Sequence, residues 1–123
     1  MKILKGNKCG EVILVAVDLS SDLKCCGEPM SELTANSVDA AKEKHVPVIY
    51  KDYSGIIVNV GSIAHPMTEE HHIAWISLHT EQGNQRKRLS HTEEPKAVFA
   101  LAEGDRPITA YARCNLHGLW KGE

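Results

Sequence analysis

The 123-residue sequence has little net charge, with 14 basic side chains against 16 acidic ones and a formal charge of -2. Without a strong positive field, the chain has no general attraction for nucleic acid or for an anionic membrane. Its one basic run, Arg86-Lys87-Arg88, is short, and we interpret it as the solvated face of a strand or hairpin. The composition therefore argues against nucleic acid and membranes as partners.

Long apolar segments are also missing. The apolar run 12–17 is far shorter than the ~20 residues that cross a bilayer, and polar residues follow the first five residues at once, so no export signal is visible. Four cysteines in a chain without such a signal are used more often for metal ligation than for disulfides. We therefore expect a cytoplasmic protein in a reducing compartment.

Short strand-like segments separated by turn signals fill the larger part of the chain. A helical turn is expected over 37–44, with Ser37 as N-cap and an end before Pro47. Strands spaced by roughly 8–12 residues, without long amphipathic helices, predict an all-β, immunoglobulin-like antiparallel β-sandwich. The expected strands are 46–50, 56–60, 73–78, 85–89, 96–101 and 108–113.

The first 36 residues form a separate small unit in this interpretation. It contains Cys9, an apolar strand at 12–17, a turn at 18–22 and the pair Cys25-Cys26. Such a unit is too small for a sufficient apolar core and needs a metal or a partner chain to hold it together. The sequence thus predicts two domains, 1–36 and 37–123.

Three histidines crowd into one short stretch: His65, His71 and His72. Neutral imidazole is the commonest protein ligand for the later transition metals, so this stretch predicts a metal site. Pro66 favours a loop at His65, with a strand starting near His71, and adjacent residues of a strand point to opposite sides. Only one of His71 and His72 is therefore expected to be a ligand, and periodicity does not decide which.

Two further places offer metal donors. His45 lies upstream, and the Cys-x-x-His segment 114–117 follows the last expected strand. Structural zinc is almost always four-coordinate, so four imidazoles and one thiolate either include a bystander or indicate a metal of higher coordination, such as iron. Four other aromatic side chains are interpreted as surface or packing residues: His79, His91, Trp75 and Trp120.

Three motifs, 38–48, 65–76 and 114–120, together resemble the superoxide reductase family, which comprises desulfoferrodoxin and neelaredoxin. The resemblance covers essentially the whole chain. It implies a ferrous iron with four equatorial imidazoles and one axial thiolate, and it favours His71 over His72, where the family pattern usually has an aromatic residue. The implied iron ligands are His45, His65, His71, His117 and Cys114.

The same resemblance gives roles to Glu43 and Lys44, directly before His45. It implies that Glu43 can occupy the sixth iron position of the oxidised enzyme, and that Lys44 lies beside the open face. A lysine there would attract superoxide and help to supply a proton. The implied reaction is one-electron reduction of superoxide to hydrogen peroxide, with electrons from rubredoxin or a similar carrier, in a homodimer or homotetramer.

The N-terminal unit departs from the family pattern. Two-iron members carry Cys-x-x-Cys followed by Cys-Cys, a desulforedoxin-like site that holds a second iron in four thiolates. This chain has Cys9, Cys25 and Cys26, but Gly6 stands three residues before Cys9. We therefore predict that the second iron is absent or labile. The alternatives are iron held by three thiolates and an exogenous ligand, or a Cys9 disulfide formed during handling.

Two other functions remain open at the level of sequence. One is a non-catalytic iron or zinc module, or an electron-transfer module, in which the site is closed or zinc takes four of the five donors. The other is a structural domain that has lost its activity. Glu43 and Lys44, present beside all five donors, argue against the second of these.

Overall fold

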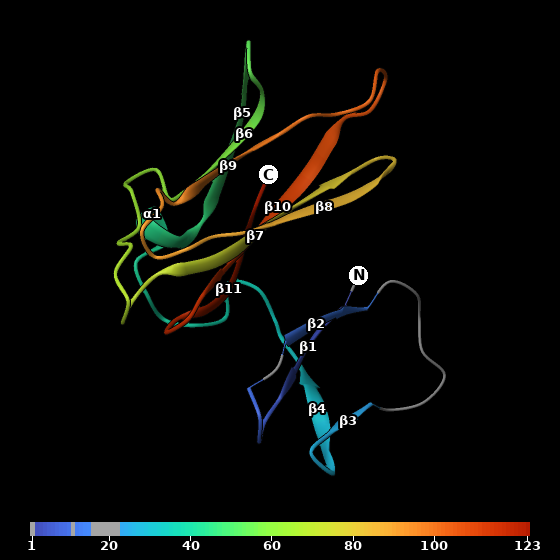
Figure 1. Cartoon of the computed structure of the whole chain (residues 1–123), viewed down its shortest axis with the longest axis vertical. Helices are drawn as coiled ribbons and strands as arrows, with labels where there is room; N and C mark the ends of the chain where they lie inside the picture. The colour runs from blue at the N-terminus through green and yellow to red at the C-terminus, as the bar shows by residue number, and fades with distance from the viewer. Residues whose placement is uncertain (1, 11, 16–22) are drawn as a thin grey trace. The chain divides into compact units, whose positions relative to one another are not determined.

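The structure is a computed structural model that describes residues 2–10, 12–15 and 23–123. Contacts divide the chain into two compact units, Met1–Thr34 and Ala35–Glu123, and both are built from antiparallel strands (Figure 1). The predicted all-β, antiparallel fold is confirmed. The predicted turn at 18–22 and the end of the predicted strand 12–17 lie outside the described residues.

The larger unit consists of two sheets whose inner faces share one core. The four-stranded sheet has the order β11-β10-β7-β8, and the three-stranded sheet has the order β5-β6-β9. The strands are β5 (Pro47–Asp52), β6 (Gly55–Val60), β7 (Ile73–Thr80), β8 (Gly83–Arg88), β9 (Lys96–Phe99), β10 (Pro107–Cys114) and β11 (Gly118–Gly122).

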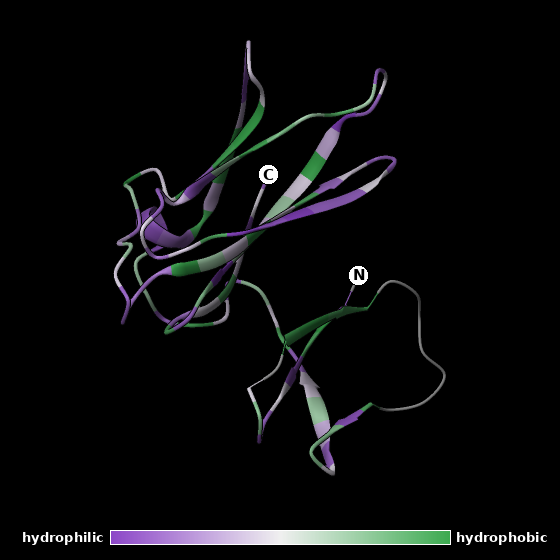
Figure 2. Ribbon diagram, viewed as in Figure 1, coloured by the Kyte–Doolittle hydropathy of each residue, from purple (hydrophilic) through white to green (hydrophobic). Residues whose placement is uncertain are grey.

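Alternation of side chains along the strands produces this core. Ile56, Val58 and Val60 of β6 face the same interior as Ile76 and Leu78 of β7, and all five are at most 7% exposed. The basic strand β8, by contrast, is exposed along its whole length and is hydrophilic in Figure 2, as predicted for a solvated face. Because the core fixes the strands, the loops at their ends can carry a site.

The structure differs from the sequence prediction at two elements of this unit. Helix α1 (Lys42–His45) is a single turn that begins five residues after the predicted start at Ser37, and Ala41 occupies its N-cap position. Strand β11 was not predicted at all, yet it pairs with β10 over five residues, from Ala110–Gly122 to Cys114–Gly118. Both differences lie beside the residues proposed to bind iron.

The smaller unit is a four-stranded antiparallel sheet with the order β2-β1-β4-β3. Its strands are β1 (Lys2–Gly6), β2 (Val12–Val15), β3 (Lys24–Cys25) and β4 (Glu28–Glu32). Ile3 is the buried hydrophobic residue of its described part, and a disulfide joins Cys9 to Cys25.

Within the described residues, no helix has the length and apolar character needed to span a membrane.

Candidate metal centre

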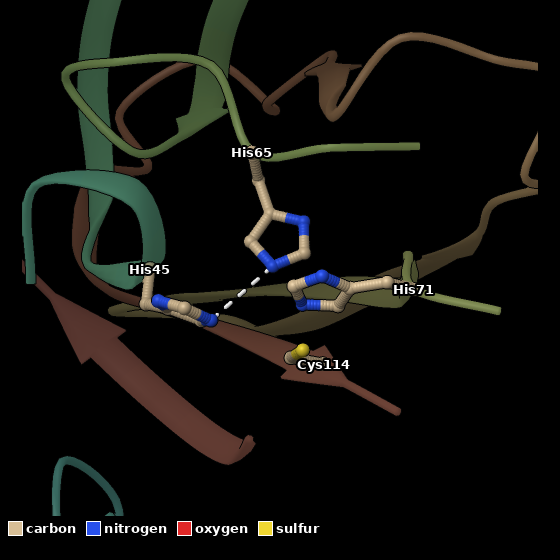
Figure 3. Close-up of side chains that lie close together, drawn as sticks. All are labelled: His45, His65, His71 and Cys114. Atoms are coloured by element: carbon tan, nitrogen blue, oxygen red, sulfur yellow. Dashed lines mark hydrogen bonds between the residues drawn. The ribbon is translucent and has the colours of Figure 1, made fainter. Parts of the chain in front are cut away.

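Residues from four separate segments of the larger unit converge at one end of the sandwich. His45 ends α1, His65 lies in the loop after β6, His71 precedes β7 and Cys114 ends β10. One donor atom from each of these four lies within 4.8 Å of the others, and Figure 3 shows the three rings and the sulfur pointing toward a common centre. The sequence separation of these residues means that the whole fold is needed to assemble the group.

His117, in the turn between β10 and β11, joins the same group. Its Nδ1 lies 3.2 Å from His45 Nε2 and 3.8 Å from Cys114 Sγ. His65 Nε2 also lies 3.2 Å from His45 Nε2. The structure thus brings together all five residues that the resemblance implied as iron ligands.

Backbone carbonyls fix which ring nitrogens face the centre. His45 Nδ1 lies 2.7 Å from Ala41 O, and His65 Nδ1 lies 2.7 Å from Pro66 O. A carbonyl oxygen only accepts, so each Nδ1 carries the hydrogen and each Nε2 presents a lone pair. Two lone pairs 3.2 Å apart repel each other unless a cation lies between them, and this arrangement is typical of metal-binding histidines.

One ring nitrogen of His71 is buried without a hydrogen-bond partner, as expected for a metal-binding histidine. Among the described residues, its Nε2 is the one buried side-chain nitrogen or oxygen atom without a hydrogen-bond partner. Buried polar atoms without partners are costly and rare, and a metal ion would satisfy this nitrogen directly. The donor set therefore fits a transition metal.

Burial lowers the pKa values of three of these imidazoles, those of His45, His65 and His71, and so favours their neutral form. It lowers the pKa of His65 to about 4, although the hydrogen bond to Pro66 acts in the opposite direction. Burial is also the largest cause of the lowered pKa values of His45 and His71. Since a metal binds the neutral ring, a low pKa means that no proton has to be removed near neutral pH.

The single sulfur of the group is fully buried at Cys114. The backbone N–H of His117 donates to Cys114 Sγ at 3.3 Å, and Trp120 Nε1 donates to His117 O at 3.0 Å. The Trp120 ring also lies 4.9 Å from the His45 ring, between their centroids. Trp120 thus packs against the site and shields it, in line with the sequence interpretation.

His72 lies outside the group. Its Nδ1 lies 3.0 Å from Thr68 O, and its ring centroid is 6.2 Å from that of His91. His79 is also remote from the group, since its ring lies 4.7 Å from Tyr111 and its Nε2 contacts Ser77. Of the adjacent pair, the structure therefore brings only His71 to the other donors.

Asn115 was not singled out from the sequence, yet it holds two donor segments together. Its Nδ2 donates to Glu70 O, and its Oδ1 accepts from the His72 N–H, both at 2.9 Å. Its own N–H donates to His72 O at 3.2 Å. These bonds bracket His71 on both sides. Sequence gives no sign of this because the partners lie more than 40 residues away.

Helix α1 is held by the loop that carries His65. Gly61 has φ +80°, and a Cβ there would lie 2.5 Å from Glu43 O. The Ile63 N–H donates to the same oxygen at 2.9 Å. Glu43 and Lys44 are both exposed on this turn. The Lys44 ammonium is a minor contributor to the lowered pKa of His71, after burial and neighbouring histidines, so its charge reaches the site.

Comparison with known proteins agrees with this geometry. The desulfoferrodoxin family model matches residues 37–123. A desulfoferrodoxin from Syntrophotalea carbinolica is 48% identical over the whole chain and 96% of its own length. A superoxide reductase from Thermococcus kodakarensis is 40% identical over 76% of this chain and 96% of its own length.

A solved structure is similar along almost the whole chain. The superoxide reductase from Treponema pallidum is 40% identical, covers 98% of both chains and has a TM-score of 0.82. Fold, gathered donors and relatives therefore agree: this chain belongs to the desulfoferrodoxin family.

Proposed function

We propose that this protein is a superoxide reductase, which reduces superoxide to hydrogen peroxide at a non-haem iron. The observation that carries the proposal is the convergence of four imidazoles and one cysteine sulfur on one centre. Relatives named superoxide reductase, in sequence and in structure, support it. The residues that would hold the iron are His45, His65, His71, His117 and Cys114.

An iron held by these residues would supply the one electron that superoxide takes up, and an external donor would return that electron. The mixed set of imidazoles and one thiolate is compatible with iron, since imidazole suits iron and a thiolate raises its electron density. The hydrogen bond from the His117 N–H to Cys114 Sγ would moderate the charge of that sulfur. Trp120 would limit the access of water from its own side.

In this proposal, residues of α1 attract the superoxide anion and supply a proton to it. Lys44 is exposed and close enough to influence His71, so its ammonium would draw superoxide toward the centre and donate a proton directly or through water. Glu43, next to it, is the carboxylate that would approach the centre in the oxidised protein. Two protons and one electron convert superoxide to hydrogen peroxide, and no dioxygen is released.

The electron donor would be a small one-electron carrier such as rubredoxin, and the protein would act as a homodimer or homotetramer in the cytoplasm. These parts of the proposal rest on the family resemblance. They are open to direct measurement by reduction kinetics with purified rubredoxin and by sedimentation.

Anaerobic mixing of the ferrous protein with superoxide tests the reaction. We expect stoichiometric oxidation of iron, formation of peroxide and no evolution of dioxygen. Evolution of dioxygen would mean dismutation and would contradict the proposal.

A spectroscopic control separates the enzyme from a non-catalytic metal module. The oxidised iron protein should show a visible thiolate-to-ferric band that disappears in Cys114→Ser, because Cys114 is the sulfur of the group. A colourless zinc protein from an iron-replete host would favour the non-catalytic module instead.

A further inference from the structure

The sulfur cluster of the smaller unit, formed by Cys9, Cys25 and Cys26, is separate in sequence and fold from the iron site. The three sulfur atoms lie within 4.8 Å of one another. Cys9 and Cys25 form a disulfide, whereas Cys26 is a free and exposed thiol. Cys26 Sγ lies 3.9 Å from Cys25 Sγ, so the thiol is next to one sulfur of the disulfide.

This cluster does not fit a four-thiolate iron. Position 6 faces the sulfurs, since a Cβ there would lie 2.6 Å from Cys9 Sγ and 3.1 Å from Cys25 Sγ, but glycine has no side chain to supply a fourth ligand. Two of the three sulfurs are also joined to each other, and a disulfide sulfur carries no thiolate charge to bind a metal. The sulfurs therefore need another role.

The turn between β3 and β4 presents Cys26 for reaction. Cys26 and Gly27 have φ values of 54° and 78°, which is the pattern of a two-residue type I′ hairpin. Cys25 stays in the strand, paired with Glu28, while Cys26 stands at the exposed tip. The backbone thus holds a solvent-accessible thiol beside a disulfide, and rotation of the exposed Cys26 side chain is needed to bring its sulfur in line with the Cys9–Cys25 bond for exchange.

We propose that Cys9, Cys25 and Cys26 form a thiol–disulfide exchange site. The Cys26 thiolate attacks Cys25 Sγ, the Cys25–Cys26 bond forms as the Cys9–Cys25 bond breaks, and Cys9 takes up the proton that Cys26 released. No electron is gained or lost in this step. A soluble dithiol then gives two electrons and two protons to the disulfide and is itself oxidised to a disulfide.

The smaller unit therefore cycles between one disulfide with one thiol and three thiols, as a two-electron couple. This proposal rests on the sulfur geometry and not on the reaction at the iron, so either can fail without the other.

Tryptic mapping of the full-length, iron-loaded, oxidised protein tests it. Trypsin cuts after Lys8, Lys24 and Lys42, so Cys9 falls in peptide 9–24 and both other cysteines fall in peptide 25–42. A Cys9–Cys25 disulfide joins the two peptides, and a Cys25–Cys26 disulfide does not. The protein is incubated at pH about 8, quenched with acid, labelled at free thiols and digested.

In the oxidised wild-type protein we expect two populations. In the first, a disulfide joins peptides 9–24 and 25–42. In the second, Cys9 carries the label and peptide 25–42 contains an internal disulfide. Cys26→Ser should lose the second population, and dithiothreitol should reduce its disulfide several-fold more slowly than in wild type. Equal reduction rates, the absence of joined peptides, or sulfurs protected by a metal that a chelator removes would each overturn the proposal. The wild-type map is informative even if Cys26→Ser fails to fold.

Discussion

Asn115 is not one of the proposed metal donors, but its hydrogen bonds hold the segments that carry them. Its three hydrogen bonds connect the Cys-x-x-His turn to the backbone on both sides of His71. Residues that orient metal ligands typically change metal affinity by roughly 10–100-fold when they are replaced. The orientation of His71, which has no hydrogen bond of its own at Nε2, therefore depends on Asn115.

We expect Asn115→Ala to weaken metal binding by roughly 10–100-fold and to shift the thiolate-to-metal band, because His71 and the Cys114 turn lose their connection. Chelator competition with Fe²⁺ or Co²⁺ measures the affinity. Asn115→Asp is the matched control, since it keeps the acceptor for the His72 N–H and loses only the donor to Glu70 O. Unchanged affinity in Asn115→Ala would show that the turn holds His71 without this side chain.

The adjacent histidines allow a second test with a built-in control. His71→Gln should cost iron and activity, because a donor of the centre is removed. His72→Gln should leave the ferric band in place, because the His72 ring contacts Thr68 and lies near His91 instead. Metal analysis and visible spectra of both variants measure this. Loss of iron in the His72 variant alone would reverse the assignment.

His79 gives a prediction about pH that is independent of the metal. Burial lowers its pKa below the ordinary value of 6.5, so the unfolded state binds the proton more readily than the folded state. His79 therefore lowers stability as pH falls below about 6.5, and the loss is complete below its folded pKa. His79→Gln should flatten the fall in the melting temperature between pH about 7.5 and about 5. Exposed His91→Gln is the control, and an equal effect from both would contradict the argument.

Among single residues, the sequence predicted the five side chains that the structure brings together, but not the groups that hold them in place. The spacing of His65, His71 and the Cys114–His117 pair predicted a metal site, and the resemblance selected His71. Ala41 O, Pro66 O and Asn115 were out of reach, because a carbonyl acceptor has no sequence signature and the partners of Asn115 are distant in the chain.

Among the contacts between elements, the close approach of the 61–65 loop to α1 is the most important for the proposed metal site. A Cβ at position 61 would overlap the carbonyl groups of Glu43 and Lys44 in α1 and also Ile63 O, so only glycine fits there. The same loop ends at His65, and α1 ends at His45. Loop and helix thus place two imidazoles and the exposed Lys44 as one assembly.

We expect Gly61→Ala to reduce metal affinity as well as stability. An alanine with positive φ costs about 1–2 kcal/mol, and the overlap with α1 adds about 1–3 kcal/mol. Gly104→Ala is a matched control, because Gly104 has φ +85° but a Cβ there would meet nothing within 4 Å. Urea unfolding and chelator competition measure both variants. Equal effects would mean that only the backbone conformation matters at Gly61.

The elements themselves were predictable where side chains alternate or form buried runs. The six predicted strands of the larger unit correspond to β5 through β10, and in all of them except the exposed β8 the periodicity reflects the core directly. Strand β11, with glycine at both ends, becomes a strand only through its pairing with β10. The predicted helix start at Ser37 was wrong, because the single turn begins only after Ala41. The Ala41 carbonyl accepts a hydrogen bond from His45 Nδ1.

In the molecule as a whole, the proposed metal site and the disulfide belong to different units, and each is expected to stabilise its own unit. The proposed metal donors all belong to Ala35–Glu123, whereas the disulfide belongs to Met1–Thr34. Both tryptophans, Trp75 and Trp120, are in the larger unit, so tryptophan fluorescence follows that unit alone.

Removal of the metal should lower the fluorescence-detected melting temperature by on the order of 10 °C, since free metal at about 100 times its Kd adds about 3 kcal/mol. Reduction of the Cys9–Cys25 disulfide should leave that transition in place. Thermal scans with and without chelator, and with and without dithiothreitol, measure both effects. A shift caused by the reductant but not by the chelator would contradict this assignment.

The spread of the donors along the chain also sets when the protein can acquire its metal during synthesis. His45 and His117 are 72 residues apart. A growing chain on the ribosome exposes the early histidines long before Cys114 and His117 emerge. The full set of donors therefore exists only after the chain has been made through His117, and the metal that fills the centre is selected from those the cell offers at that stage.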